Sequence, residues 1–243
     1  MDPRIVEEVS RLRGDLLDSE YGIVEDLYNS LGGGCCRFVE VGCGSLGLLG
    51  RQGDRLGALK SRSIGIDVDL DGLADNSNVA HRLCASSNSL PLKSGSVDII
   101  VSRWMFEHLE APEEALREFA RVLKTGGFLY IKTPNLWNYA MLVSWATPTF
   151  LHNMFRAATG HGDNIPTFYR ANTERSLRAL AARTGFTVRR VERYSYSYMY
   201  YMFNKELFVL MRSLSALMGR VTDRTQLALC CVLQKAEPQA LPT

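Results

Sequence analysis

The sequence predicts an α/β fold in which helices cover both faces of a mainly parallel sheet. Short apolar runs typical of buried strands alternate with segments whose apolar residues recur at helical spacing. A glycine-rich turn directly follows the first of these apolar runs, at the point where a strand would give way to a helix. The 243 residues, 46% of them hydrophobic, suffice for one large domain with a substantial core.

The elements follow one another in a regular order. Residues 3–30 carry apolar side chains at helical spacing and stop at the glycines of residues 32–34, so one or two helices are expected there. Strands are expected at residues 35–41, 63–69, 78–84, 97–102, 128–133, 186–196 and 226–235. Helices are expected at residues 45–59, 112–124, 172–185 and 205–220. The first of these helices is weak because glycines interrupt it, whereas Pro112 suits the first turn of the second.

Residues 134–172 break the alternation of strands and helices. They hold three prolines, two tryptophans and mixed polar residues, and a stretch this long between regular elements favours a lid. No internal repeat or low-complexity linker divides the chain. We therefore expect a single domain over residues 1–243, with a helical cap at residues 1–33 and a lid at residues 134–172.

Composition limits the class of partner and the compartment. The net charge of +2 does not favour nucleic acid, and no run of 18 uncharged apolar residues predicts a transmembrane segment. The N-terminus has no apolar signal core, so a cytoplasmic protein is expected. None of the six cysteines forms C-x-x-C and all stand in or beside apolar runs, which predicts buried reduced thiols and no metal site.

The glycine turn, VEVGCGSLG, has the spacing G-x-G-x-x-G and ends the first predicted strand. Asp67 ends the second strand, where a carboxylate can accept hydrogen bonds from both hydroxyls of a ribose. That chemistry fits NAD and S-adenosylmethionine equally well. Glu40 favours the second, because a carboxylate two residues before Gly42 would repel a pyrophosphate but can hold an ammonium group, directly or through water.

Six motifs in order carry a family resemblance between about Arg37 and Asn135. They are E-x-G-x-G, the strand-end acid, S-L-P-L, V-D-I-I-V-S, F-E-H-L and L-K-T-G-G. Together they resemble the class I S-adenosylmethionine-dependent methyltransferases, most closely the group that acts on small molecules and quinone-like lipids. The resemblance implies a Rossmann-like seven-stranded, mostly parallel sheet of order 3-2-1-4-5-7-6 whose last strand is antiparallel. It also implies S-adenosyl-L-methionine as the cofactor.

The resemblance further implies which residues bind the cofactor. The glycines would wrap the methionine portion and the sulfonium, Glu40 would hold the ammonium, Asp67 the ribose and Val68 the adenine. Ser86 stands where the family often has an acid that takes the adenine amino group, which weakens that contact. The implied cofactor-binding residues are Glu40, Gly42, Cys43, Gly44, Gly47, Asp67, Val68, Ser86, Ser102 and Arg103.

Candidates for a catalytic base are His108, His152, His161 and Tyr169, since histidine titrates near neutral pH. The family's E-H pair, which includes His108, also serves to hold loop and helix together, so both roles stay open. Alternating tyrosines at residues 194–200 predict either a half-buried sheet edge or an aromatic wall for the acceptor. The helix at residues 205–220 offers an amphipathic surface to the same acceptor or to a second subunit in a homodimer.

Four functions remain open at this point. The first is O-methylation of a small hydroxylated, partly apolar metabolite in biosynthesis, and the second is methylation of a lipid-linked or quinone-like acceptor. The third is a cofactor-binding regulatory protein without catalysis, suggested only by Ser86. The fourth is an NAD-dependent oxidoreductase, which Glu40 opposes.

Overall fold

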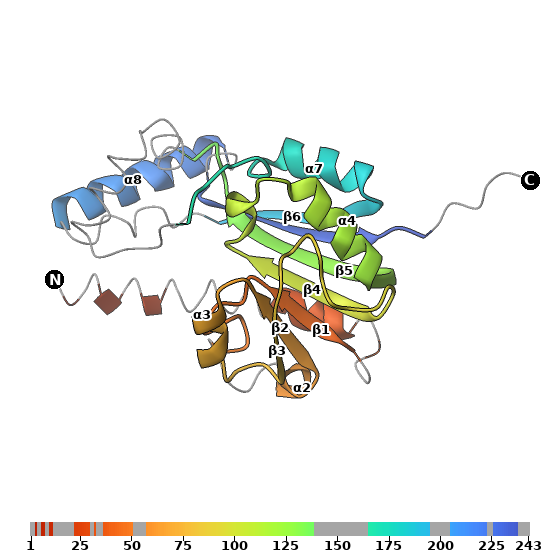
Figure 1. Cartoon of the computed structure of the whole chain (residues 1–243). Coiled ribbons are helices and arrows are strands. Elements are labelled where there is room, and N and C mark those ends of the chain that lie inside the picture. Colours follow the sequence, from red (N-terminus) through yellow and green to blue (C-terminus); the bar gives the residue numbers. More distant parts are fainter. Residues whose placement is uncertain are drawn as a thin grey trace, which may run out of the picture.

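The structure, a computed structural model, describes residues 22–29, 36–50, 57–138, 165–194, 205–222 and 226–237, with a few isolated positions before residue 33. Within them, seven strands form one sheet in the order β3-β2-β1-β4-β5-β7-β6 (Figure 1). The strands are β1 (Phe38–Val41), β2 (Ser63–Asp67), β3 (His81–Cys84), β4 (Val97–Arg103), β5 (Leu123–Pro134), β6 (Phe186–Tyr194) and β7 (Ala228–Lys235).

The pairing of the strands confirms the expected topology. Strand β1 pairs in parallel with β2 and β4, β2 with β3, and β4 with β5. Strand β7 runs antiparallel to both β5 and β6. All seven residues of β4 are buried, as expected for a central parallel strand that is covered on both faces.

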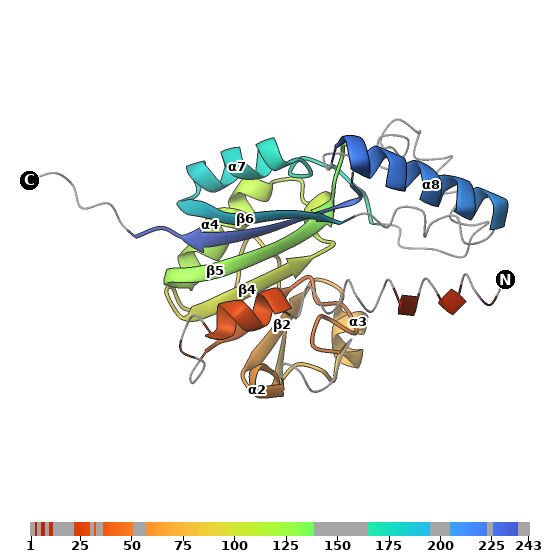
Figure 2. The ribbon, with the colours of Figure 1, turned by 180° about the vertical axis from the view of Figure 1, so that it is seen from behind.

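Helices cover the two faces of this sheet. The described ones are a helical stretch at 22–29, α2 (Gly57–Lys60), α3 (Leu70–Asp75), the 3-10 turn η1 (Phe106–His108), α4 (Pro112–Val122), α7 (Glu174–Arg183) and α8 (Lys205–Val221). Figures 1 and 2 show α4 and α7 on one face and the helix 22–29, orange-red in Figure 2, on the other. Each face has its own buried cluster of apolar side chains.

Strand alternation assigns side chains to these two clusters. Ile100 and Ile131 belong to the cluster under α4 and α7. Val101 and Tyr130, one position away on the same strands, belong to the cluster under helix 22–29. The two faces can therefore be followed to the carboxyl ends of β4 and β5, where polar side chains replace apolar ones.

One predicted helix is wrong over its first part. Residues 45–50 form consecutive turns, residues 51–56 lie outside the described part, and only α2 at the end of the predicted stretch is helical. Gly47 has a φ of +59°, which is a left-handed conformation that no α-helix contains. The main-chain N–H of Leu48 donates to the Glu40 side chain.

Several other expectations fall partly or wholly outside the described residues. The lid is described only at its ends, at residues 134–138 and 165–172, and the cap only at 22–29 and a few isolated positions. His152, His161, Cys35 and the tyrosines after Tyr194 are not described. Of the described cysteines, Cys84 is exposed, so burial was wrongly expected for it, because β3 is an edge strand with exposed side chains. The helices of the described part include none that is long and apolar enough to cross a membrane.

Candidate functional site

The carboxyl ends of β1, β2, β4 and β5 meet along one edge of the sheet, where ligands bind in open α/β folds. The glycine loop leaves β1 at this edge. Gly42, Gly44 and Gly47 all have positive φ values, at +78°, +49° and +59°. Only glycine adopts this conformation without strain, so the loop's path depends on these residues. A Cβ on Gly42 would also lie 3.0 Å from the Cβ of Met105, which packs against the loop from the segment after β4.

Glu40 lies beneath the loop, with 1% of its surface exposed. Its two carboxylate oxygens accept from the Leu48 main-chain N–H at 2.8 and 2.7 Å. A Cβ on Gly47 would lie 2.6 Å from Glu40 Oε2, so the carboxylate fits only because residue 47 is glycine. The structure therefore gives Glu40 a structural role as the anchor of the loop's far end. Its contact with an ammonium group stays a prediction.

Asp67 connects the glycine loop to the end of β2. Its Oδ2 accepts from the Gly44 main-chain N–H at 2.7 Å, and its Oδ1 accepts from the Asp69 N–H at 3.0 Å. A carboxylate oxygen can accept two hydrogen bonds, so the contacts described leave room for a pair of ribose hydroxyls. Asn76 supports the same arrangement, because its Nδ2 donates to the Gly44 carbonyl at 2.8 Å.

Val68 presents an apolar side chain next to this carboxylate. It is 70% exposed, although Ile66, two residues earlier, is fully buried. An exposed valine at the ligand-binding edge of a sheet offers a surface on which a flat ring can pack. The fit between these residues and a nucleoside is therefore good: one carboxylate for the ribose, one apolar side chain for the base, and a glycine loop that permits close approach of the main chain.

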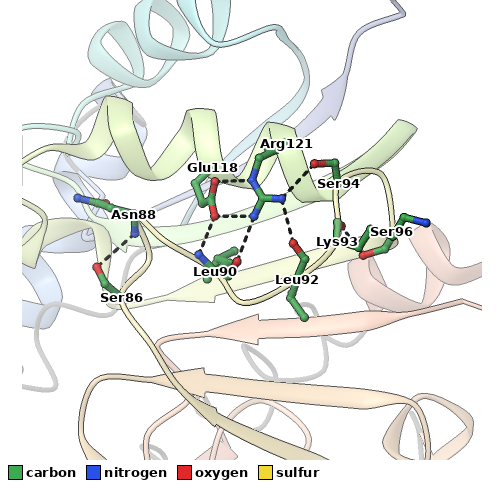
Figure 3. Close-up of polar contacts among 9 residues, drawn as sticks. All are labelled: Ser86, Asn88, Leu90, Leu92, Lys93, Ser94, Ser96, Glu118 and Arg121. Carbon is green, nitrogen blue, oxygen red and sulfur yellow. Dashed lines mark hydrogen bonds and ion pairs between the residues drawn. The ribbon is translucent and has the colours of Figure 1, made fainter.

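The loop that carries Ser86 is held from two sides. The Ala85 N–H donates to the Asp67 main-chain carbonyl at 3.0 Å, which fixes the start of the loop beside β2. Figure 3 shows the second support. The guanidinium of Arg121, on α4, donates hydrogen bonds to the main-chain carbonyls of Leu90 and Leu92. The Ser86 hydroxyl accepts weakly from the Asn88 N–H at 3.3 Å, and Ser86 is exposed. The serine thus lies on an ordered loop near Asp67, where it can reach a ligand.

Cys43 contributes its main chain to the loop, not a reactive thiol. Its side chain is buried, and this burial, followed by the charges of Glu40 and Asp67, raises the pKa of the thiol to about 12. The thiol is therefore protonated at neutral pH and is a poor nucleophile. Burial has the same effect on the pKa of Cys231, which rises to about 12.

Polar side chains are buried at the carboxyl ends of β4 and β5. Ser102 is fully buried and lies 3.7 Å from the sulfur of Met105, measured from its Oγ. Arg103 and Lys132 are also buried, and they occupy partner positions in the pairing of the two strands. Trp104 follows with a φ of +54°, an uncommon conformation for a bulky residue.

A second polar group links the turn after β4 to the segment before α7. Glu107 is 5% exposed, and burial raises the pKa of its carboxyl to about 7. The Thr133 hydroxyl donates to it at 3.3 Å and in turn accepts from the Asn172 amide at 2.7 Å. The main-chain N–H groups of Phe168 and Tyr169 both donate to the Glu107 carbonyl.

His108 and Tyr169, both candidates for a base, lie in this group. The His108 Nδ1 is 2.9 Å from the carbonyl oxygen of Pro166. A carbonyl only accepts, so Nδ1 carries the proton and the neutral ring keeps a lone pair on Nε2. Tyr169 has a φ of +52°, which makes it, with Trp104, one of two described non-glycine residues in the left-handed region. His152 and His161 are outside the described residues.

The predicted cofactor-binding residues thus lie along one edge of the sheet, at the carboxyl ends of the parallel strands. They are the glycine loop, Asp67, Val68, Ser86, Ser102 and Arg103. Sequence reasoning missed Met105, Asn76 and Lys132. Met105 and Asn76 carry no motif of their own, and their roles depend on contacts with distant parts of the chain. Lys132 could have been noticed, because a lysine inside the apolar run FLYIKT is unusual in a buried strand.

The fold and this site resemble those of one class of protein, the class I S-adenosylmethionine-dependent methyltransferases. Residues 39–131 match the family model described as "Methyltransferase domain". The matched stretch runs from β1 to β5 and contains the glycine loop and Asp67. Residues 39–131 therefore match a methyltransferase domain, and a relative reported below is named as S-adenosylmethionine-dependent.

Curated relatives match part of the chain. A "Ubiquinone biosynthesis O-methyltransferase" of Xanthomonas oryzae pv. oryzae is 29% identical over 133 residues, which cover 51% of this chain and 54% of the relative. A "Probable S-adenosylmethionine-dependent methyltransferase" of Mycobacterium tuberculosis is 33% identical over 100 residues, covering 40% of this chain and 35% of the relative. The chain thus spans about half or less of the length of these relatives.

Solved structures share the fold at low identity. A methyltransferase from Mesorhizobium loti superposes with a TM-score of 0.57 at 18% identity, covering 83% of this chain and 91% of that one. A geranyl diphosphate C-methyltransferase from Streptomyces coelicolor, solved with S-adenosyl-L-homocysteine, gives a TM-score of 0.51 at 15% identity, covering 83% and 71%. These likenesses confirm the fold class.

Replacing Gly47 with alanine should destabilise the protein more than replacing Gly44. At Gly44 an added Cβ meets nothing within 4 Å, so Gly44→Ala should cost only the left-handed backbone, about 1–2 kcal/mol. Gly47→Ala should cost about 1–3 kcal/mol more, because the Cβ displaces the buried Glu40 carboxylate from the Leu48 N–H. Urea denaturation of the two variants measures the difference, and equal losses would show that Glu40 does not anchor the loop.

The stability of the protein should depend on the ionisation of Glu107. Its pKa is about 7 in the folded protein against an ordinary value of 4.5, so between these values the folded chain holds a proton that the unfolded chain has released. Stability from this group is therefore lost as the pH rises toward 7. The free energy of unfolding of Glu107→Gln should equal that of the parent near pH 5. At pH 8 it should exceed the parent's by on the order of 3 kcal/mol. The exposed Glu110→Gln should follow the parent throughout, and a Glu107→Gln curve parallel to the parent's would contradict the account.

Proposed function

We propose that the chain binds S-adenosylmethionine and methylates an oxygen of a small hydroxylated, partly apolar metabolite. The observation that supports this best is the double role of Asp67. Its carboxylate accepts from the Gly44 N–H of the glycine loop and lies at the ligand-binding end of β2, beside the exposed Val68. The Asp67 carboxylate thus joins the glycine loop to the end of β2, and a nucleoside linked to an amino acid would contact both.

In this proposal the ribose binds to Asp67, the adenine packs on Val68 near Ser86, and the amino-acid portion follows the loop from Gly42 to Gly47. The cofactor, when bound, supplies a methyl group on a positively charged sulfur. The chain positions the acceptor, excludes water and removes a proton. Alignment of the reacting groups and a dry site account for much of the rate in such transfers.

His108 is the proposed base among the described residues. Its Nδ1–H is held by the Pro166 carbonyl, so the neutral ring can accept the proton of an acceptor hydroxyl at Nε2. Tyr169 lies in the same segment as Pro166, and its N–H donates to the Glu107 carbonyl. His152, His161 and Tyr169 remain alternative bases. The single-domain arrangement, with a cap at 1–33 and a lid at 134–172, is likewise proposed.

A quinone-like or lipid-linked acceptor is the second candidate. Curated relatives with this name support it, although the match is limited to about half of their length. Helix α8 supports it too, because Leu210, Leu214 and Leu217 are 62%, 39% and 59% exposed on one side of the helix. Figures 1 and 2 both show α8 beyond the end of the sheet at which β4 ends, where this proposal puts the acceptor.

Binding of the cofactor should depend on Asp67. Asp67→Asn should weaken the binding of S-adenosylhomocysteine by about 1.5–3 kcal/mol, because it removes a charge-assisted pair of hydrogen bonds. Asp71→Asn, which neutralises an exposed carboxylate in the first turn of α3, should bind like the parent. Calorimetric titration with S-adenosylhomocysteine and with NAD measures both. Unchanged affinity in Asp67→Asn, or tighter binding of NAD, would refute the assignment.

Methyl transfer to a panel of acceptors separates the remaining functions. The leading proposal expects transfer to water-soluble phenols and catechols by the parent and its loss in Asp67→Asn. Transfer only to acceptors with a polyprenyl tail would favour the quinone-like alternative. Tight cofactor binding without transfer to either group would leave the regulatory interpretation.

A further inference from the structure

Two cationic side chains lie next to each other at the acceptor's end of the sheet. Arg103 is the last residue of β4, and Lys132 is its partner in the pairing of β4 with β5. They are 7% and 1% exposed. Partner residues on adjacent strands project from the same face. This face is that of Val101 and Tyr130, two residues earlier on each strand, so the cations continue the apolar cluster under helix 22–29.

Trp104 adds a flat ring to the two cations. Its N–H donates to the Lys132 carbonyl at 2.8 Å, and the Lys132 Nζ lies 5.2 Å from the centre of its indole ring. The left-handed backbone of Trp104 is strained for a side chain of this size. Such strain is retained where it fixes a side chain for a function. Here it places an aromatic surface against an ammonium group, beside a guanidinium.

Arg103 and Lys132 lie near the start of the glycine loop. Ser102 is the partner of Val41, the residue directly before Gly42, and Arg103 follows Ser102. Lys132 lies on β5, the strand on the side of β4 away from β1. The two cations therefore extend from the cofactor loop toward the part of the sheet that the cofactor would leave open. The same face also carries the buried Glu40 carboxylate, the partner of Val101 on β1, whose oxygens accept from the Leu48 N–H.

We propose that Arg103 and Lys132 bind an anionic group of the methyl acceptor, a carboxylate or a phosphate, with the Trp104 ring against the acceptor's own planar part. A guanidinium binds either anion through two parallel hydrogen bonds, and an ammonium adds a compact charge. At low exposure these attractions are screened less than at the surface. The inference deepens the proposed function and rests on it, because it takes the carboxyl ends of β4 and β5 as the acceptor's site.

Simple aromatic probes test the inference without knowledge of the natural acceptor. Benzoate and benzamide have the same shape and differ in charge, and phenyl phosphate replaces the carboxylate by a phosphate. Titration calorimetry at low ionic strength, with and without S-adenosylhomocysteine, gives the dissociation constant of each probe. The parent should bind at least one anion more than tenfold tighter than benzamide, and the tighter of the two identifies the anion. Arg103→Gln and Lys132→Met should each lose this preference.

Control variants separate this inference from the proposed function. Arg189→Gln, which neutralises an exposed arginine of β6, should bind the anions like the parent. Arg103→Lys keeps the positive charge and should retain part of the preference for the anionic probes over benzamide. This variant provides the test if Lys132→Met does not fold. Anions that bind no better than benzamide, or equally well to Arg103→Gln, overturn the inference. Loss of S-adenosylhomocysteine binding in Arg103→Gln with unchanged anion binding also overturns it, since Arg103 would then hold the cofactor's carboxylate. Failure of the parent to bind S-adenosylhomocysteine would instead refute the proposed function.

Discussion

The hydrogen bond between the Gly44 N–H and the Asp67 carboxylate is the contact on which the site depends. It joins the loop after β1 to the end of β2, at 2.7 Å, and so fixes the Asp67 carboxylate against the main chain of a glycine. Glu40 secures the far end of the same loop through Leu48. Two carboxylates with different tasks thus shape one loop: one is buried and structural, and the other keeps capacity for further hydrogen bonds.

Buried polar residues at and beyond the carboxyl ends of β4 and β5 distinguish this edge of the sheet, where the proposal places the acceptor. On one face, Asn172, Thr133 and Glu107 form a chain of hydrogen bonds that ties the segment before α7 to the turn after β4. On the other face, Arg103 and Lys132 occupy positions that strand alternation would otherwise give to apolar residues. Polar groups are costly to bury, so their concentration at one edge of an apolar sheet indicates a site for a ligand with polar groups.

The sheet was predictable because its strands are apolar runs whose burial needs no knowledge of their neighbours; VDIIVS of β4 is buried at every position. The order of the strands and the positions of Asp67 and the glycines followed from a resemblance in motifs. The helix expected at residues 45–59 failed at its start because a side chain from β1, Glu40, takes the N–H that a helical turn would use. Lys132 and Met105 were missed because their roles arise from strand register and loop packing.

The most direct test of this account is a crystal structure of the chain with S-adenosylhomocysteine. We expect both ribose hydroxyls within hydrogen-bond distance of the Asp67 carboxylate, the adenine against Val68, and the homocysteine portion along the loop from Gly42 to Gly47, with Glu40 still bound to Leu48. A ligand bound elsewhere on the chain, or one whose ribose does not contact Asp67, would contradict the assignment of the site.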